Sequence, residues 1–247
     1  MDQGRGGRTP QFMRAALIAA GLGERLRNGG IQVPKPLVPI AGVPLIDRVL
    51  AAVAAVGIKE VACIFNEEAD AVEAHCRQSA RHLELYIVRR TTPSSMESLF
   101  ALAPYLHNGR FLLLTVDAVF GPTVLPELLA AAARYPDADG VLGVHDFVDD
   151  EKPLRLTVDA ENRVTSLGPD AGASPLITAG LYVFDPRIFR EVDAARAARF
   201  TALRQFLGHL VQTGYRLYGA RLPKTIDVDR PEDVRTAEAF VRNGFTA

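Results

Sequence analysis

The chain has 247 residues, of which 48% are hydrophobic, 23% charged and 7% aromatic, a composition that is ordinary for a globular protein. Lys and Arg total 28 and Asp and Glu total 29, so the net charge of −1 argues against a protein that binds nucleic acid through a basic face. The two cysteines, Cys63 and Cys76, exclude a disulfide framework and a zinc site made of cysteines alone.

Residues 1–12 are rich in glycine and arginine and have no apolar segment of signal-peptide form behind them. No apolar run approaches the roughly 18 residues that a membrane span needs. We therefore expect a disordered leader over 1–12, a single domain over 13–247, and a cytoplasmic protein that contacts no membrane.

Apolar periodicity alternates between strand-like and helix-like segments up to residue 144. It predicts strands over 13–19, 60–65, 83–88, 111–116 and 140–144, and helices over 44–56, 68–79, 95–106 and 123–135. Strands that alternate with helices in this way indicate βαβ units, with a mostly parallel sheet and helices on both faces. The strand over 111–116 is so apolar that we expect both of its faces to be buried.

The pattern changes after residue 145. Short strands over 154–158 and 163–167 predict a hairpin, and a strand over 176–184, a helix over 201–213, a strand over 216–222 and a helix over 231–241 follow. The fold expected is α/β: a three-layer α/β/α sandwich with a mixed, mostly parallel sheet and a small antiparallel inserted portion.

The loop after the first strand carries Gly21, Gly23 and Arg25. Glycines at the carboxyl end of a buried strand let backbone N–H groups approach an anion, and a guanidinium beside them suits a phosphate. The spacing is neither the dinucleotide fingerprint nor a P-loop, and such turns are often only structural. Lys35 lies between two prolines, where it is either an exposed loop lysine or a fixed positive charge for a phosphate.

Acidic residues follow two of the predicted strands. Asp117 comes directly after 111–116, and an aspartate there is either a loop or capping acid or a ligand of Mg²⁺, which favours one or two carboxylates plus substrate phosphates. Its partner would be Asp227 or Asp229, which share a face if this segment is extended. One of the two could bind metal while the other caps the helix that begins at Pro231.

The segment 89–98 also leads from a strand into a helix and presents the hydroxyls of Thr92, Ser94 and Ser95. Ser94 or Ser95 fits the N-cap position of that helix. A binding role for this loop stays open beside the capping role.

Residues 15–45, AALIAAGLGERLRNGGIQVPKPLVPIAGVPL, resemble the signature of the sugar-phosphate nucleotidyltransferases: a glycine-rich loop with an arginine, a Pro-Lys-Pro-Leu segment and a Gly-x-Pro-Leu turn into a helix. Residues 177–184, ITAGLYVF, resemble the acceptor-side strand of that family. Residues 225–234, TIDVDRPEDV, resemble a closing segment shared with cytidylyltransferases. The likeness spans residues 13–242.

The resemblance implies a fold like that of the nucleotide-diphospho-sugar transferases. It implies transfer of a nucleoside monophosphate from an NTP to a sugar 1-phosphate, giving a nucleotide-sugar and pyrophosphate. By position it implies catalytic roles for Arg25 and Lys35, and Mg²⁺ held by Asp117 with Asp227 or Asp229, of which the closing segment slightly favours Asp229. It also implies nucleotide contacts from Ala20, Gly21, Gly23, Thr92, Ser94 and Ser95, and acceptor contacts from Thr178 and Gly180.

Two departures from the family pattern bear on the substrate. Val116 stands where the family more often has glycine, and residues 94–99, SSMESL, replace a Gly-Thr-Ala-type segment. The serine-rich loop favours the alternative of a cytidylyltransferase acting on choline phosphate or a polyol phosphate. A glycosyltransferase and a non-catalytic nucleotide or sugar-phosphate sensor are further alternatives. The partners expected are small-molecule substrates, with a homo-oligomer left open.

Overall fold

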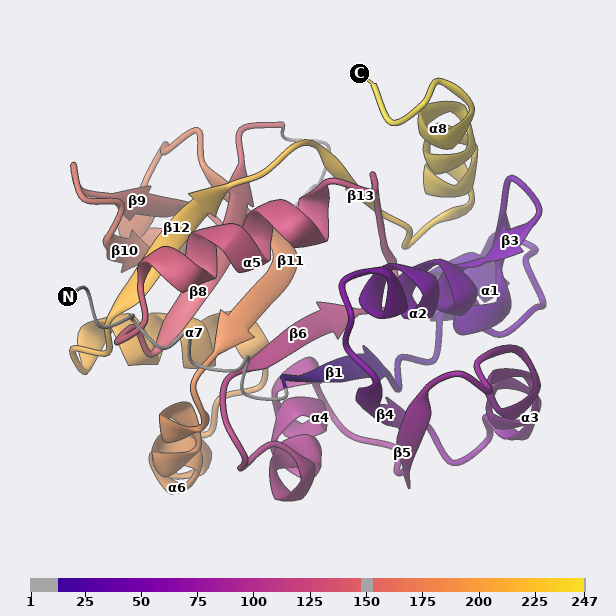
Figure 1. Cartoon of the computed structure of the whole chain (residues 1–247), viewed down its shortest axis with the longest axis horizontal. Helices are drawn as coiled ribbons and strands as arrows, with labels where there is room; N and C mark the ends of the chain where they lie inside the picture. Colours follow the sequence, from indigo (N-terminus) through magenta and orange to yellow (C-terminus); the bar gives the residue numbers. More distant parts are fainter. Residues whose placement is uncertain (1–12, 148–152, 247) are drawn as a thin grey trace, which may run out of the picture.

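The computed structural model describes residues 13–147 and 153–246, so the leader expected over 1–12 lies outside the described residues. A seven-stranded sheet runs through the molecule in the order β12-β8-β11-β6-β1-β4-β5 (Figure 1). Its strands in chain order are β1 (Arg14–Ala19), β4 (Glu60–Phe65), β5 (Glu84–Arg89), β6 (Phe111–Thr115), β8 (Gly140–His145), β11 (Ile177–Phe184) and β12 (Leu217–Arg221).

Every neighbouring pair in this sheet is parallel except the two that involve β11, which runs antiparallel between β6 and β8. The sheet is therefore mixed and mostly parallel, as predicted. The strand after residue 175 belongs to the centre of this sheet, so the separate antiparallel portion reduces to the hairpin of β9 (Leu156–Val158) and β10 (Val164–Leu167).

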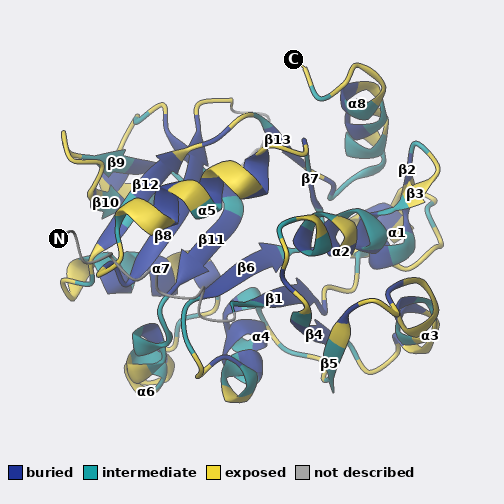
Figure 2. Ribbon diagram, in the orientation of Figure 1, coloured by how far each residue is buried: buried dark blue, intermediate teal, exposed yellow. Residues whose placement is uncertain are grey.

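Helices cover both faces of the sheet. One face carries α1 (Glu24–Asn28), α2 (Leu45–Ala55), α3 (Asp70–Ser79), α5 (Val124–Arg134) and α8 (Pro231–Arg242). The other carries α4 (Ser95–Leu102), α6 (Val192–Ala197) and α7 (Leu203–Gln212). Figure 2 shows the central strands buried between these two layers. The three-layer sandwich expected from the sequence is confirmed.

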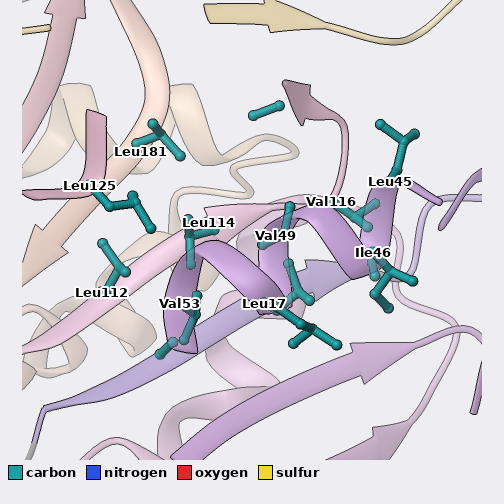
Figure 3. Packing of buried hydrophobic residues seen from close by; sticks show 14 of the residues in the cluster. Leu17, Leu45, Ile46, Val49, Val53, Leu112, Leu114, Val116, Leu125 and Leu181 are labelled. Carbon is teal, nitrogen blue, oxygen red and sulfur yellow. The ribbon is translucent and has the colours of Figure 1, made fainter. Parts of the chain in front are cut away.

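Strand β6 shows why two cores form. Leu112 and Leu114 point into the core under α2 and α5, whereas Phe111 and Leu113 point into the core under α4 and α7, and all four are fully buried. Both faces of this strand are buried because successive side chains of a strand alternate in direction. In Figure 3, Val49 and Val53 of α2 lie over Leu114 and over Leu17 of β1.

Short elements complete the fold and were not predicted. β7 (Ala118–Phe120) pairs antiparallel with β13 (Thr225–Asp227), and β2 (Pro39–Ile40) pairs with β3 (Val43–Pro44). Short 3₁₀ segments occur at Lys35–Leu37, Ala103–Tyr105, Gly168–Ala171 and Pro186–Glu191. No helix in the described ranges is both long enough and apolar enough to cross a membrane.

Candidate active site

A cavity of about 540 Å³ opens at the carboxyl ends of β1 and β6. Its lining comes from five separate parts of the chain: residues 18–25, Lys35, residues 91–95 with Ser98, residues 115–117 and Asp229. It brings together most of the residues singled out from the sequence, namely Ala20, Gly21, Gly23, Arg25, Lys35, Thr92, Ser94, Ser95, Asp117 and Asp229. Thr178, Gly180 and Asp227 are not among its lining residues.

The two glycines of the first loop differ in backbone conformation and in the space around them. Gly23 has a left-handed backbone with φ of 63°, and a Cβ built on it would lie 3.0 Å from the Cβ of Lys35. Only glycine combines that conformation with so close a neighbour at low cost. Gly21 has no atom within 4 Å of its own Cβ position, so this position faces open space in the cavity.

Lys35 joins the two predicted acids at the floor of the cavity. Its Nζ lies 2.6 Å from Oδ2 of Asp117 and 2.6 Å from Oδ1 of Asp229, and only 9% of its side chain is exposed. Burial by itself lowers the pKa of Lys35, but the two carboxylates outweigh burial and the pKa is raised. The lysine is therefore charged at neutral pH.

Asp117 is charged for the complementary reason. Burial by itself raises the pKa of Asp117, but the attraction of Lys35 and hydrogen bonds from Lys35 and Thr115 lower the pKa overall. The site thus holds an ammonium between two carboxylates, and Arg25 adds a second cation with its Nη1 3.4 Å from Oδ2 of Asp229.

Backbone pairing places the two acids. Asp117 and Asp229 flank the short β7–β13 pair, and the N–H of Val228 donates to the carbonyl oxygen of Asp117 at 3.0 Å. Strand β13 ends at Asp227, so strand alternation does not extend to Asp229. Asp229 reaches Lys35, whereas Oδ1 of Asp227 lies 3.9 Å from the Cβ position of Gly180.

The acceptor-side strand β11 lies next to β6 and carries the other predicted residues. Gly180 has a left-handed backbone with φ of 70°, and its Cβ position lies 3.6 Å from Oγ1 of Thr115. The hydroxyl of Tyr182 donates to Oγ1 of Thr178 at 3.3 Å. Gly180 therefore lies close to the cavity edge at Thr115, while Thr178 is engaged within its own strand.

The serine-rich loop is anchored by hydroxyl contacts. Ser94 is the N-cap of α4, because the N–H of Glu97 donates to its Oγ at 3.3 Å, and Ser95 lines the cavity without this role. Oγ1 of Thr92 lies 2.6 Å from Oγ of Ser98, which is 2% exposed. Ser98 belongs to the segment 89–98 that the sequence singles out, but no site role was assigned to it, because its only signal is a hydroxyl one helical turn after the cap.

The carboxylate pair fits a divalent cation. Oxygens of Asp117 and Asp229 already converge on one cationic nitrogen, and hard carboxylate oxygens are the ligands that Mg²⁺ prefers. Within residues 13–147 and 153–246, no group of three or more His, Cys, Asp and Glu residues forms a candidate metal cluster. Mg²⁺ usually keeps several waters and binds substrate phosphates beside one or two carboxylates, so oxygens of water or of a bound phosphate would complement this pair.

Comparison with known proteins places this geometry in a family. Residues 15–214 match the family described as MobA-like NTP transferase domain. The chain belongs to this family. The resemblance seen in the sequence is thereby confirmed.

Three relatives show how far the similarity extends. CMP-5'-(3-aminopropyl)phosphonate synthase of Streptomyces rubellomurinus is 34% identical over 62% of this chain and 27% of its own length. The bifunctional IPC transferase and DIPP synthase of Rubrobacter xylanophilus is 30% identical over 92% of this chain and 51% of its own length. Mannose-1-phosphate guanylyltransferase of Mycobacterium tuberculosis is 28% identical over 92% of this chain and 62% of its own length. The chain thus spans between about a quarter and three fifths of these relatives.

Solved structures share the fold. The inositol-1-phosphate CTP transferase from T. maritima superposes with a TM-score of 0.79 at 21% identity, covering 96% of this chain and 99% of that one. UDP-glucose pyrophosphorylase complexed with UDP-glucose superposes with a TM-score of 0.78 at 15% identity, covering 94% of this chain and 99% of that one.

Proposed function

We propose that this chain is a nucleotidyltransferase that joins the nucleoside monophosphate of an NTP to the phosphate of a small acceptor and releases pyrophosphate. The observation that carries the proposal is the convergence of Lys35, Asp117 and Asp229 in a cavity beside a glycine-rich loop. The volume of about 540 Å³ lies within the range of small-molecule sites, roughly 300–1,000 Å³.

The chemistry requires charge and position more than a protein nucleophile. An oxygen of the acceptor phosphate forms a bond to the α-phosphorus, the bond from that phosphorus to the β-phosphate oxygen breaks, and pyrophosphate leaves with the electron pair. The acceptor phosphate is largely ionised at neutral pH, since its second pKa is about 6, so no general base is needed. Among the residues that the structure describes, those that line the cavity include neither histidine nor cysteine.

The residues of the cavity divide the remaining tasks. The backbone N–H groups of residues 20–23 bind the triphosphate, and Lys35 and Arg25 offset the negative charge that develops at the α-phosphate. Asp117 and Asp229 would hold Mg²⁺, which supplies neutralisation of the triphosphate charge when bound. Thr92, Ser94 and Ser95 line the same cavity, and we assign them to the nucleoside.

We assign the acceptor to the region beside β11. Gly180 and Asp227 lie close together there, and Thr178 belongs to the same strand as Gly180. One candidate acceptor is a sugar 1-phosphate, which would give a nucleotide-sugar. Similarity to mannose-1-phosphate guanylyltransferase supports this candidate.

A second candidate is transfer from CTP to a phosphorylated alcohol such as a polyol phosphate or choline phosphate. The serine-rich loop over 94–99 supports it, as does the 34% identity to a protein whose name includes a CMP product. The high TM-score to an inositol-1-phosphate CTP transferase agrees in fold. We favour this candidate for the nucleobase and acceptor.

The test is a panel that measures pyrophosphate release with MgCl₂ for ATP, CTP, GTP, UTP and dTTP. Each is paired with hexose 1-phosphates, inositol phosphates and choline phosphate, with Asp117→Asn as control. Release from CTP with an alcohol phosphate would support the favoured candidate, and release with a hexose 1-phosphate would support the other. Binding of a triphosphate without release from any pair would favour a sensor and contradict the proposal.

A further inference from the structure

Asp233 lies outside the cavity but is bonded to the segment that carries Asp229. Its Oδ2 accepts the backbone N–H of Asp229 at 2.9 Å and that of Arg230 at 2.7 Å. Asp233 is the third residue of α8, the position at which a side chain can reach back to the N-cap. From the sequence we expected Asp227 or Asp229 to cap this helix, but Asp233 provides these bonds instead.

The two bonds restrict the backbone on which Asp229 is carried. On one side, the N–H of Val228 is held by the carbonyl oxygen of Asp117. On the other side, Asp233 holds the next two N–H groups. The peptide units around Asp229 are thus fixed from both directions, so its carboxylate meets Lys35 from a defined backbone position.

Packing at the start of α8 tightens the same segment. A Cβ built on Gly29 would lie 2.2 Å from Cγ of Pro231, so the end of α1 lies directly against the first residue of α8. Helix α1 also carries Arg25, whose guanidinium reaches Asp229. Glycine at position 29 and the carboxylate of Asp233 therefore act on the same short stretch of chain.

We propose that Asp233 is a positioning residue for the metal-dependent reaction: its carboxylate holds the backbone of Asp229 so that the carboxylates of Asp229 and Asp117 meet at one cation position. This inference rests on the proposed function. Partners that orient a ligand from behind it change metal affinity by roughly 10–100-fold when they are removed. An ordinary helix cap changes only the stability of the fold.

The test separates the two roles with a matched control. Asp159 also uses one carboxylate to accept two backbone N–H groups, those of Glu161 at 3.0 Å and Arg163 at 2.8 Å, in the turn between β9 and β10. Asp159→Ala thus removes the same kind of contact at a residue that is not part of the cavity lining. We would compare it with Asp233→Ala, Asp233→Asn and Asp233→Ser.

The readouts are the melting temperature of the nucleotide-free protein and the MnCl₂ concentration that gives half of its maximal thermal stabilisation. Asp233→Ala is expected to raise that concentration by about 10-fold or more. Asp233→Asn retains an oxygen that accepts both N–H groups and is expected to stay within about 3-fold, with Asp233→Ser intermediate. Asp159→Ala is expected to lower the melting temperature without changing the Mn²⁺ response.

Two results would overturn the inference, and they differ from each other. If Asp233→Ala and Asp159→Ala both lower the melting temperature and neither changes the Mn²⁺ response, then Asp233 is only a helix cap. If the wild-type protein itself shows no response to Mn²⁺, the proposed metal site is wrong and this inference fails with it.

Discussion

Replacing Lys35 by methionine removes the positive charge between the two carboxylates and keeps a side chain of similar length. The ammonium lies 2.6 Å from both Asp117 and Asp229, so the variant leaves two negative groups facing each other. Removing one partner of a fully buried ion pair costs about 3–5 kcal/mol. Here Asp229 is 48% exposed and Asp117 24% exposed, so solvent screening reduces the expected loss to about 2 kcal/mol.

That loss corresponds to a melting temperature lower by about 4–8 °C in a chain of this length. A divalent cation should reverse it, because the carboxylates of Lys35→Met can bind Mn²⁺ without first releasing an ammonium. We therefore expect a larger stabilisation by Mn²⁺ in the variant than in the wild type. Turnover should fall by about 100-fold or more, since a charge aimed at the reacting phosphate is lost.

The assay is calorimetric unfolding with and without saturating MnCl₂, followed by pyrophosphate release. Lys59→Met is the matched control, because it makes the same substitution at an exposed lysine. Suppose that Lys35→Met has the melting temperature of the wild type and that MnCl₂ raises this temperature no more than in the wild type. That result would refute the view that Lys35 occupies the cation position between the acids.

Further variants test other parts of the site. Gly23→Ala should lower the free energy of unfolding by about 1–2 kcal/mol in calorimetry, because the φ of 63° at this position is left-handed. Gly21→Ala should have the stability of the wild type but raise KM for the NTP in steady-state kinetics. Asp229→Asn should abolish turnover while Asp227→Asn raises KM for the acceptor; the reverse pattern in steady-state assays would exchange their roles. Ser98→Ala removes a buried hydroxyl contact worth about 1 kcal/mol and should raise KM for the NTP about 5-fold with a smaller change in kcat.

Elements with a strong local pattern were predictable from the sequence. The run over 111–116 gave β6 because a strand buried on both faces is continuously apolar. The helix predicted over 95–106 ends earlier, at Leu102, and continues as a 3₁₀ turn through Tyr105. Pro104 accounts for the change, because proline has no N–H to donate to the carbonyl four residues earlier and so interrupts the α-helical ladder.

Elements fixed by distant contacts were not predictable. Strands β7 and β13 are three residues each, too short to show a period, and each forms because the other half of the pair lies opposite. No element was predicted between residues 185 and 200, where the structure has a six-residue 3₁₀ segment and the six-residue α6.

The candidate site shows the same division. Gly23, Lys35 and Asp117 stand out locally, through a turn, a pair of prolines and the end of a strand. Their convergence cannot be seen locally, because Lys35 is separated in the sequence from Asp117 by 82 positions and from Asp229 by 194. Asp233 was missed because an acid in the first turn of a helix is explained by capping alone, and only the folded backbone shows which N–H groups it holds.

The most direct measurement of the central claim is the stoichiometry of the reaction by ³¹P NMR, with CTP, MgCl₂ and inositol 1-phosphate as the first pair. The account predicts one pyrophosphate for each new diphosphate ester that links the acceptor phosphate to CMP, with neither product formed by Asp117→Asn or without acceptor. Pyrophosphate that forms equally well without any acceptor, or no diphosphate ester from any pair in the panel, would contradict it.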